Sequence, residues 1–147
     1  NLIDGLATNL ANQDGALEAF VAEMKKQGVW DDIAVVTISD FGRTLTSNGA
    51  GSDHAWAGNM LVMGGGVKGG QVFGKFPDSL KVGGSDEIMN RGRVLPTTSW
   101  ETMWKELAVW MGVESEEDLS KILPNLKYFT ESNGYANEIK SGEMFEA

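Results

Sequence analysis

Apolar residues recur at three- and four-residue spacing between polar positions in the first part of the chain. The stripe consists of Leu10, Leu17, Phe20, Val21 and Met24. It predicts an amphipathic helix that ends near Gly28. After a short polar turn at 30–32, residues 33–38 form a continuous run rich in β-branched side chains, typical of a strand covered on both faces. Helix, short turn and buried strand make up half of a parallel α/β unit.

A second apolar run at 60–63, which three glycines at 64–66 bring to an end, predicts another buried strand. Between the two strands the chain is polar and glycine-rich through Gly58, so we expect a loop there. Residues 71–74 predict a short edge strand, and residues 75–93 predict a long loop. A connection of that length is usually functional or forms an interface.

Helical spacing returns after the long loop. Thr98, followed three residues later by Glu101, has the pattern of a capping box, and the predicted helix runs to Gly112. Its apolar face carries Trp100, Met103, Trp104, Leu107 and Trp110. We interpret this face as a core or subunit contact, with cofactor or carbohydrate binding as the alternative.

A second capping pattern, Ser115 with Asp118, predicts one more short helix that Pro124 ends. Beyond that helix the chain is polar, and we expect it to be weakly ordered. The pattern therefore predicts one folded unit over residues 1–130 and a polar C-terminal tail over residues 131–147.

The charge and composition exclude several partners. With 147 residues, 41% of them apolar, the chain is long enough for one core. Its net charge of -9, with 12 basic residues, argues against nucleic acid and anionic membrane surfaces as partners. Cysteine is absent, which excludes disulfides and thiolate ligands. No apolar run is long enough for a membrane span, and the start at Asn1 leads us to expect a processed or excised part of a longer chain.

Candidate chemistry begins where the first strand ends, since ligands of doubly wound sheets lie beyond the carboxyl ends of the strands. Asp40 occupies that position. Its carboxylate is suited to bind a metal, to act as a base, or to cap the turn that follows, and the sequence leaves these roles open. Gly42 permits a tight bend, and the guanidinium of Arg43 offers a planar fork to an anionic substrate oxygen.

The single histidine, His54, follows Asp53 in a glycine-flanked loop just before the second strand. This context favours a metal-ligand or general-base role over a structural one. Asp53 is either a ligand itself or a partner that orients the imidazole. A catalytic metal takes three or more protein ligands, so further ligands are expected elsewhere. The chain has neither a Gly-x-Ser-x-Gly elbow nor a nucleotide-phosphate loop.

Several segments, in this order, resemble one family. They are 39–44 (SDFGRT), 51–54 (GSDH), 62–70 (VMGGGVKGG), 91–99 (RGRVLPTTS), 110–113 (WMGV) and 123–126 (LPNL). Together they resemble the DUF1501 family, uncharacterised bacterial proteins placed in the alkaline phosphatase and sulfatase-like superfamily. The similarity extends from about Asn12 to Phe129. Each segment is short, but their order along the chain is specific.

The resemblance implies a fold and a place in a longer protein. The expected fold is the C-terminal part of an α/β, alkaline-phosphatase-like three-layer sandwich with a mostly parallel sheet, formed by residues 1–130. The parent would be exported with a twin-arginine leader to the periplasm or secreted. The nucleophile and the first metal-binding aspartate would lie upstream, so this chain alone is expected to be inactive.

The resemblance also implies roles for the candidate residues. Asp40 matches a late metal aspartate and His54 a metal histidine, with Asp53 as a further candidate ligand for a divalent ion such as zinc, manganese, iron or calcium. Arg43 would face a non-bridging oxygen of a small anionic ester during phosphate or sulfate ester hydrolysis. Phe41 departs from the phosphatases, which place a metal-binding histidine there.

That departure supports a rival hypothesis, a non-catalytic exported binding or assembly module with a degenerate hydrolase site. In either case the expected partner is the upstream portion of the same protein. The tryptophan-rich helix is also suited to a homo-oligomer contact.

Overall fold

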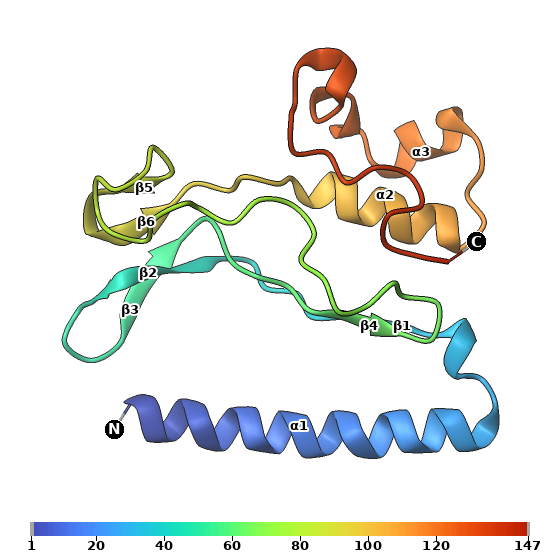
Figure 1. The fold of residues 1–147 in the computed structure, drawn as a ribbon, viewed down its shortest axis with the longest axis horizontal. Helices are drawn as coiled ribbons and strands as arrows, with labels where there is room; N and C mark the ends of the chain where they lie inside the picture. The colour runs from blue at the N-terminus through green and yellow to red at the C-terminus, as the bar shows by residue number, and fades with distance from the viewer. Residues whose placement is uncertain (1, 147) are drawn as a thin grey trace.

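The computed structural model describes residues 2–146 of the chain (Figure 1). Helix α1, Leu2–Gln27, confirms the predicted amphipathic helix. It ends at Gly28, which has a φ of 74° and donates its backbone N–H to the Lys25 carbonyl. A glycine in the left-handed region is a common way to end a helix, because it carries no β-carbon to strain. The 3₁₀ helix η1, Trp30–Asp32, then leads into strand β1, Ala34–Val36.

Strand β1 pairs with β4, Val62–Gly64, so both predicted strands exist, but they are only three residues long each and are partly rather than fully buried. The pairing is antiparallel, with Val36 opposite Val62 and Ala34 opposite Gly64. A β-carbon at Gly64 would lie 2.1 Å from the Ile33 carbonyl oxygen, so this close approach requires glycine. The chain between the two strands contains no crossover helix, and it therefore returns antiparallel. All three strand pairs within residues 2–146 are antiparallel, and the mostly parallel sandwich stays a prediction.

The β1–β4 pair lies between two helical layers, with α1 on one side and α2, Trp100–Trp110, on the other (Figure 1). Alternate residues of the strands face α2, because side chains of a strand alternate between its two faces. The partly buried residues packed against the core on that side include Ala34, Val36, Met60 and Val62. The α2 face of the strands is thus covered, whereas the face toward α1 is only partly covered, since Leu61 is 51% exposed; the prediction of strands covered on both faces holds for one face only.

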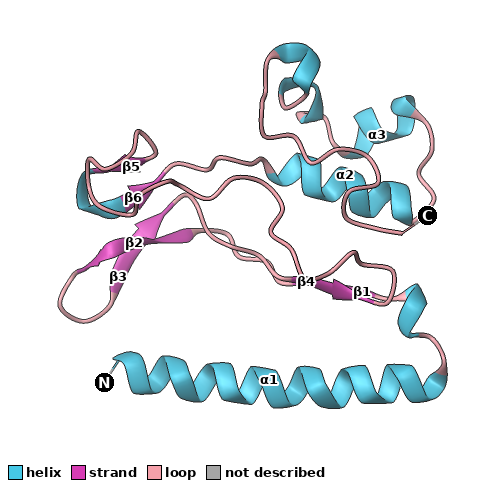
Figure 2. Ribbon diagram, in the orientation of Figure 1, coloured by secondary structure: helices cyan, strands magenta, loops and turns pink. Residues whose placement is uncertain are grey.

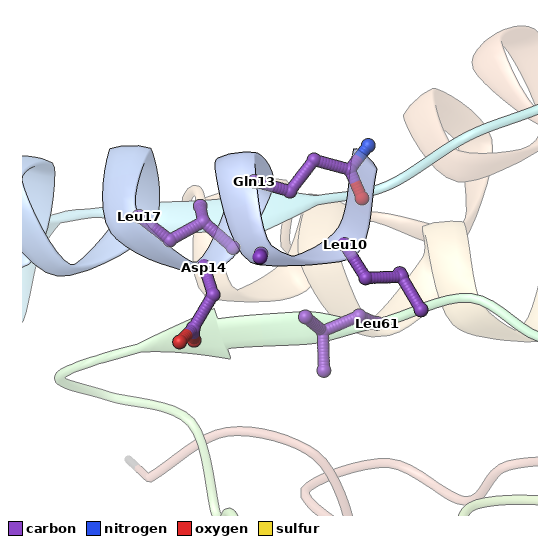
Figure 3. Close-up of a pocket in the computed structure, with 6 residues that line it drawn as sticks. Leu10, Gln13, Asp14, Leu17 and Leu61 are labelled. Atoms are coloured by element: carbon purple, nitrogen blue, oxygen red, sulfur yellow. The ribbon is translucent and has the colours of Figure 1, made fainter. Parts of the chain in front are cut away.

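On the α1 side, Leu61 lies beneath the helix and helps to form a shallow hollow of about 460 Å³ (Figure 3). Leu10 and Leu17 of the apolar stripe line it, together with Gln13 and Asp14. None of the candidate catalytic or metal-binding residues lines this hollow.

The segment after Phe129 differs from the expected weakly ordered tail. Ile139, Met144 and Phe145 form the buried core with Met103 of α2. The segment is also tied to α2 by an ion pair of 3.0 Å between Lys105 and Glu138, both largely buried. Burial raises the pKa of Glu138, but the N–H of Glu131 and the Lys105 charge outweigh it and hold that pKa below its ordinary value. The sequence shows this segment as polar because its apolar residues are few and follow no helix or strand period.

Several local predictions are corrected. Ser99, rather than Thr98, caps α2, because its side chain accepts the N–H of Glu101. Residues 71–74 form no strand, whereas the supposed loop 75–93 ends in a small hairpin. The hairpin consists of β5, Ile88–Met89, the 3₁₀ turn η2, Asn90–Gly92, and β6, Arg93–Val94.

The remaining elements follow α2. Helix α3, Glu116–Ile122, is capped by Ser115 as predicted. Two 3₁₀ turns, η3 at Leu126–Tyr128 and η4 at Glu131–Asn133, come after it (Figure 2). Among residues 2–146, no helix is both long and apolar enough to cross a membrane.

Candidate functional site

The candidate residues lie on and beside a β-hairpin that the sequence pattern did not reveal. Strands β2, Gly42–Ser47, and β3, Ser52–Ala55, pair antiparallel where we expected a loop. The turn is closed by Asn48, whose side-chain oxygen accepts the N–H groups of Ala50 and Gly51. At the other end a β-carbon on Gly42 would lie 1.7 Å from the Ala57 carbonyl oxygen, so glycine allows the strand to pack there.

The register of the hairpin places Arg43 directly opposite His54. Both side chains are exposed and both contact Phe41. The imidazole stacks on the Phe41 ring at 3.9 Å between centroids, with 20° between the planes. The Arg43 Cζ lies 5.0 Å from the centroid of the same ring. The structure thus brings a cation and an imidazole together around one aromatic ring.

Arg43 is held in place at one end of its guanidinium. Its Nη1 donates to the Ser52 carbonyl at 2.7 Å, which orients the planar group along the hairpin. A guanidinium has five N–H donors, so several remain available to an oxyanion. In the part of the chain that the structure describes, no carboxylate forms an ion pair with Arg43. An exposed arginine without a carboxylate partner is suited to bind an anionic ligand.

Asp40 lies in the connection between β1 and β2, one residue before Phe41, and is exposed. The cap of this turn is provided by Ser39, whose hydroxyl donates to the Phe41 carbonyl at 2.9 Å. The Asp40 carboxylate forms no hydrogen bond or ion pair within residues 2–146. Of the three roles that the sequence left open, the structural cap is therefore not the one observed.

Asp53 is separated from the His54 cluster, because adjacent residues of a strand point to opposite faces. Its carboxylate forms an ion pair with Arg91 at 2.8 Å and accepts a hydrogen bond from Asn48 at 2.8 Å. The hydrogen bond from Asn48, followed by the charge of Arg91, holds the pKa of Asp53 below its ordinary value of 3.8. Asp53 therefore does not orient the imidazole in this structure.

Arg91 is a functional residue candidate that the sequence did not single out. It has a φ of 63°, the left-handed region that side chains other than glycine seldom occupy. Its turn, η2, packs against β2, and a β-carbon on the adjacent Gly92 would lie 2.7 Å from the Leu45 β-carbon. The ion pair with Asp53 thus connects two segments that are far apart in sequence.

Replacement of Asp53 by asparagine is expected to change the pH dependence of stability. Because its pKa is lowered in the folded state, the carboxylate stabilises the fold above the unfolded value of about 3.8, and this contribution is lost as pH falls through the folded pKa. Wild type should therefore be more stable than Asp53→Asn at pH 7, and the difference should vanish in acid. Urea unfolding at a series of pH values measures this.

Asp86→Asn is the matched control, since its exposed carboxylate has no hydrogen bond or ion pair within residues 2–146. A difference between wild type and Asp53→Asn that persists unchanged in acid would contradict the prediction.

A metal requires more ligands than these residues bring together. Within residues 2–146 no group of three or more histidine, aspartate or glutamate side chains is placed to hold an ion. Asp53 is engaged with Arg91, whereas Asp40 and His54 have no hydrogen-bond partner in the described chain and keep their donor atoms available. Carboxylate oxygen and imidazole nitrogen suit a divalent metal, so these two fit a site that takes its other ligands from elsewhere.

In the described structure an antiparallel pair of strands lies between two helices. An exposed β-hairpin, which carries Arg43 opposite His54, comes between these two strands in sequence. The chain belongs to the DUF1501 family, described as proteins of unknown function, whose model matches residues 1–90. The matched range contains α1, the strand pair and the whole β2–β3 hairpin. Comparison with curated proteins gave no match, and comparison with solved structures gave none either.

Proposed function

We propose that the protein to which this chain contributes is an exported, metal-dependent hydrolase of phosphate or sulfate esters, located in the periplasm or secreted. The observation that carries the proposal is the register of the β2–β3 hairpin, which sets an exposed arginine opposite an exposed histidine. Two such groups on one face are suited to a small ester with a charged, tetrahedral oxyanion head.

In this proposal Arg43 binds the non-bridging oxygens of the ester. Its Ser52 contact fixes the guanidinium plane before substrate arrives, so little orientation is lost on binding. The remaining N–H donors of Arg43 would stabilise the negative charge that develops on the ester oxygens as the ester bond breaks. Preorganised donors of this kind act in the transition state as well as in the bound substrate.

Asp40 and His54 would hold the divalent ion together with ligands from the upstream portion of the protein. When bound, such an ion polarises the ester oxygen as a Lewis acid. Phe41, which stands where phosphatases supply a ligand, instead packs flat against the imidazole. The stacking restricts rotation of the ring, so Phe41 positions His54 in place of contributing a ligand.

The rival function is a non-catalytic exported binding or assembly module, and one observation favours it. The apolar stripe of α1 is exposed over much of its length, with Leu10 54% and Phe20 39% accessible. Such a surface is expected to be covered by another portion of the protein or by a partner. A binding or assembly module would use this surface to hold its partner, and metal content and ester hydrolysis distinguish the two functions.

Metal removal tests the proposal directly on the full-length protein. We expect elemental analysis of the purified protein to show bound divalent metal. The protein should hydrolyse p-nitrophenyl phosphate or p-nitrophenyl sulfate, lose the activity on chelation, and regain it with one divalent ion. Absence of both bound metal and ester hydrolysis would overturn the proposal and favour the binding module.

A further inference from the structure

A second hollow is lined by residues of η1, α2 and the C-terminal segment. These elements lie on the opposite side of the molecule from the β2–β3 hairpin (Figure 1). Its volume is about 660 Å³, within the range of small-molecule sites in proteins. One wall comes from η1 and the glycines after β4, and the other from α2 and the last residues described. The residues that matter for its chemistry are Asp31, Glu106, Trp110, Gly142, Phe145 and Glu146.

Three carboxylates from three different segments line this hollow. They belong to Asp31 of η1, Glu106 of α2 and Glu146 of the C-terminal segment. None of the three forms an ion pair within residues 2–146. Lys68 reaches the rim, where its Nζ donates to the Gly142 carbonyl at 2.7 Å, and within residues 2–146 it forms no ion pair with a carboxylate. The hollow therefore carries more negative than positive charge, and none of its three carboxylates is neutralised by an ion pair in the described chain.

Glu106 provides independent support for a ligand. Its side chain is only 3% exposed, and Oε2 accepts the backbone N–H of Met144, so the carboxylate extends from α2 toward the C-terminal segment across the hollow. The other oxygen, Oε1, is buried with no hydrogen-bond partner in the described chain. A buried carboxylate oxygen without a donor is strongly unfavourable, because it has lost its hydration without compensation.

The walls of the hollow also suit a particular kind of cation. Trp110 stacks on Phe145 at 5.1 Å between ring centroids, and both line the hollow. A β-carbon on Gly66 would lie 3.0 Å from the Trp110 Nε1, so the backbone runs close beside the indole. An indole face attracts ammonium and guanidinium groups through its quadrupole. A bare metal ion is a poor fit, since the carboxylates do not form a group placed to hold one.

We propose that this hollow binds an organic cation through an ammonium or guanidinium group, with Glu106 Oε1 as its principal hydrogen-bond acceptor. Asp31 and Glu146 lie exposed at the hollow and attract the cation, and the stacked aromatic pair packs against its carbon chain. The site is separate from the hairpin and does not depend on the proposed hydrolase activity.

Calorimetric titration of the full-length protein tests this with 1,5-diaminopentane and, separately, a blocked tripeptide with one central lysine. Both ligands present an alkylammonium group. The ligand that binds more tightly shows whether the site prefers a free amine or a lysine side chain. Uncharged 1,5-pentanediol, which has the same carbon chain as the diamine, is the matched negative control. At least one cation should bind saturably, and added salt should weaken its binding because the attraction is electrostatic.

Glu106→Gln should weaken binding of the cation by about tenfold or more, because it removes a charge-assisted hydrogen bond while keeping the shape of the side chain. Asp31→Asn provides a second variant at the same hollow and should also weaken binding. Glu116→Gln, an exposed carboxylate on α3 outside the hollow, should leave the affinity within about twofold. Absence of saturable binding, equal binding of pentanediol, or unchanged affinity in both hollow variants would overturn the proposal.

Discussion

Replacement of Arg43 by alanine in the full-length protein is expected to lower kcat/KM for ester hydrolysis by about 10²–10³-fold, as does removal of one preorganised oxyanion donor in other enzymes. The guanidinium is exposed on the hairpin, oriented by its contact with Ser52 and paired across the strands with His54. Without the guanidinium, the negative charge of the transition state would lose this hydrogen-bond donor. Steady-state kinetics with an aryl phosphate or sulfate measures the effect.

Two further variants separate this role from general effects of charge and folding. Lys81→Ala removes an exposed cation elsewhere and should leave kcat/KM nearly unchanged. Arg43→Lys keeps the charge but loses the planar fork, so it should restore only part of the activity. Equal activity of Arg43→Ala and wild type, with bound metal retained, would contradict the role of Arg43 in substrate binding.

Replacement of Phe145 by alanine is expected to reduce the free energy of unfolding by about 3–5 kcal/mol, the usual effect of removing a buried aromatic ring. Phe145 is 5% exposed, belongs to the core with Met103 and Met144, and stacks on Trp110. The segment that carries it would then lose this packing against α2. Urea unfolding of the full-length protein measures the change.

Phe76→Ala is the matched control, because Phe76 is 51% exposed and removal of its ring should change stability by only about 0.5 kcal/mol or less. The two variants remove the same atoms and differ in burial. If both had the same small effect, the C-terminal segment would be the dispensable polar tail that its sequence suggests.

Elements with a strong local signal were predicted well. The apolar stripe of α1, the β-branched run of β1 and the capping serine of α3 each depend on neighbours within a few residues. The cap of α2 was displaced by one residue, from Thr98 to Ser99, since both types satisfy the same pattern. Family membership also followed from short segments in order, and the family match over residues 1–90 confirms it.

The candidate site was predicted only in part. Arg43 and His54 lie opposite each other in the β2–β3 hairpin, and Asp40 precedes that hairpin in the β1–β2 connection. The sequence groups Asp53 with these residues because it is next to His54. Neighbouring residues of a strand point to opposite faces, however, and Asp53 forms an ion pair with Arg91 on the other face. No sequence pattern indicated Arg91 as a site residue, because its ion pair with Asp53 joins residues that are 38 positions apart.

The sequence by itself determined the main helices, the two central strands, the negative charge and the family, because each depends on local periodicity or on composition. Only the tertiary structure decided that Arg43 faces His54, that Asp53 pairs with Arg91, and that Phe145 enters the core. Those facts depend on strand register and on contacts between distant segments. Register selects which face every side chain occupies, and no local pattern fixes it when the strands are short, polar and rich in glycine.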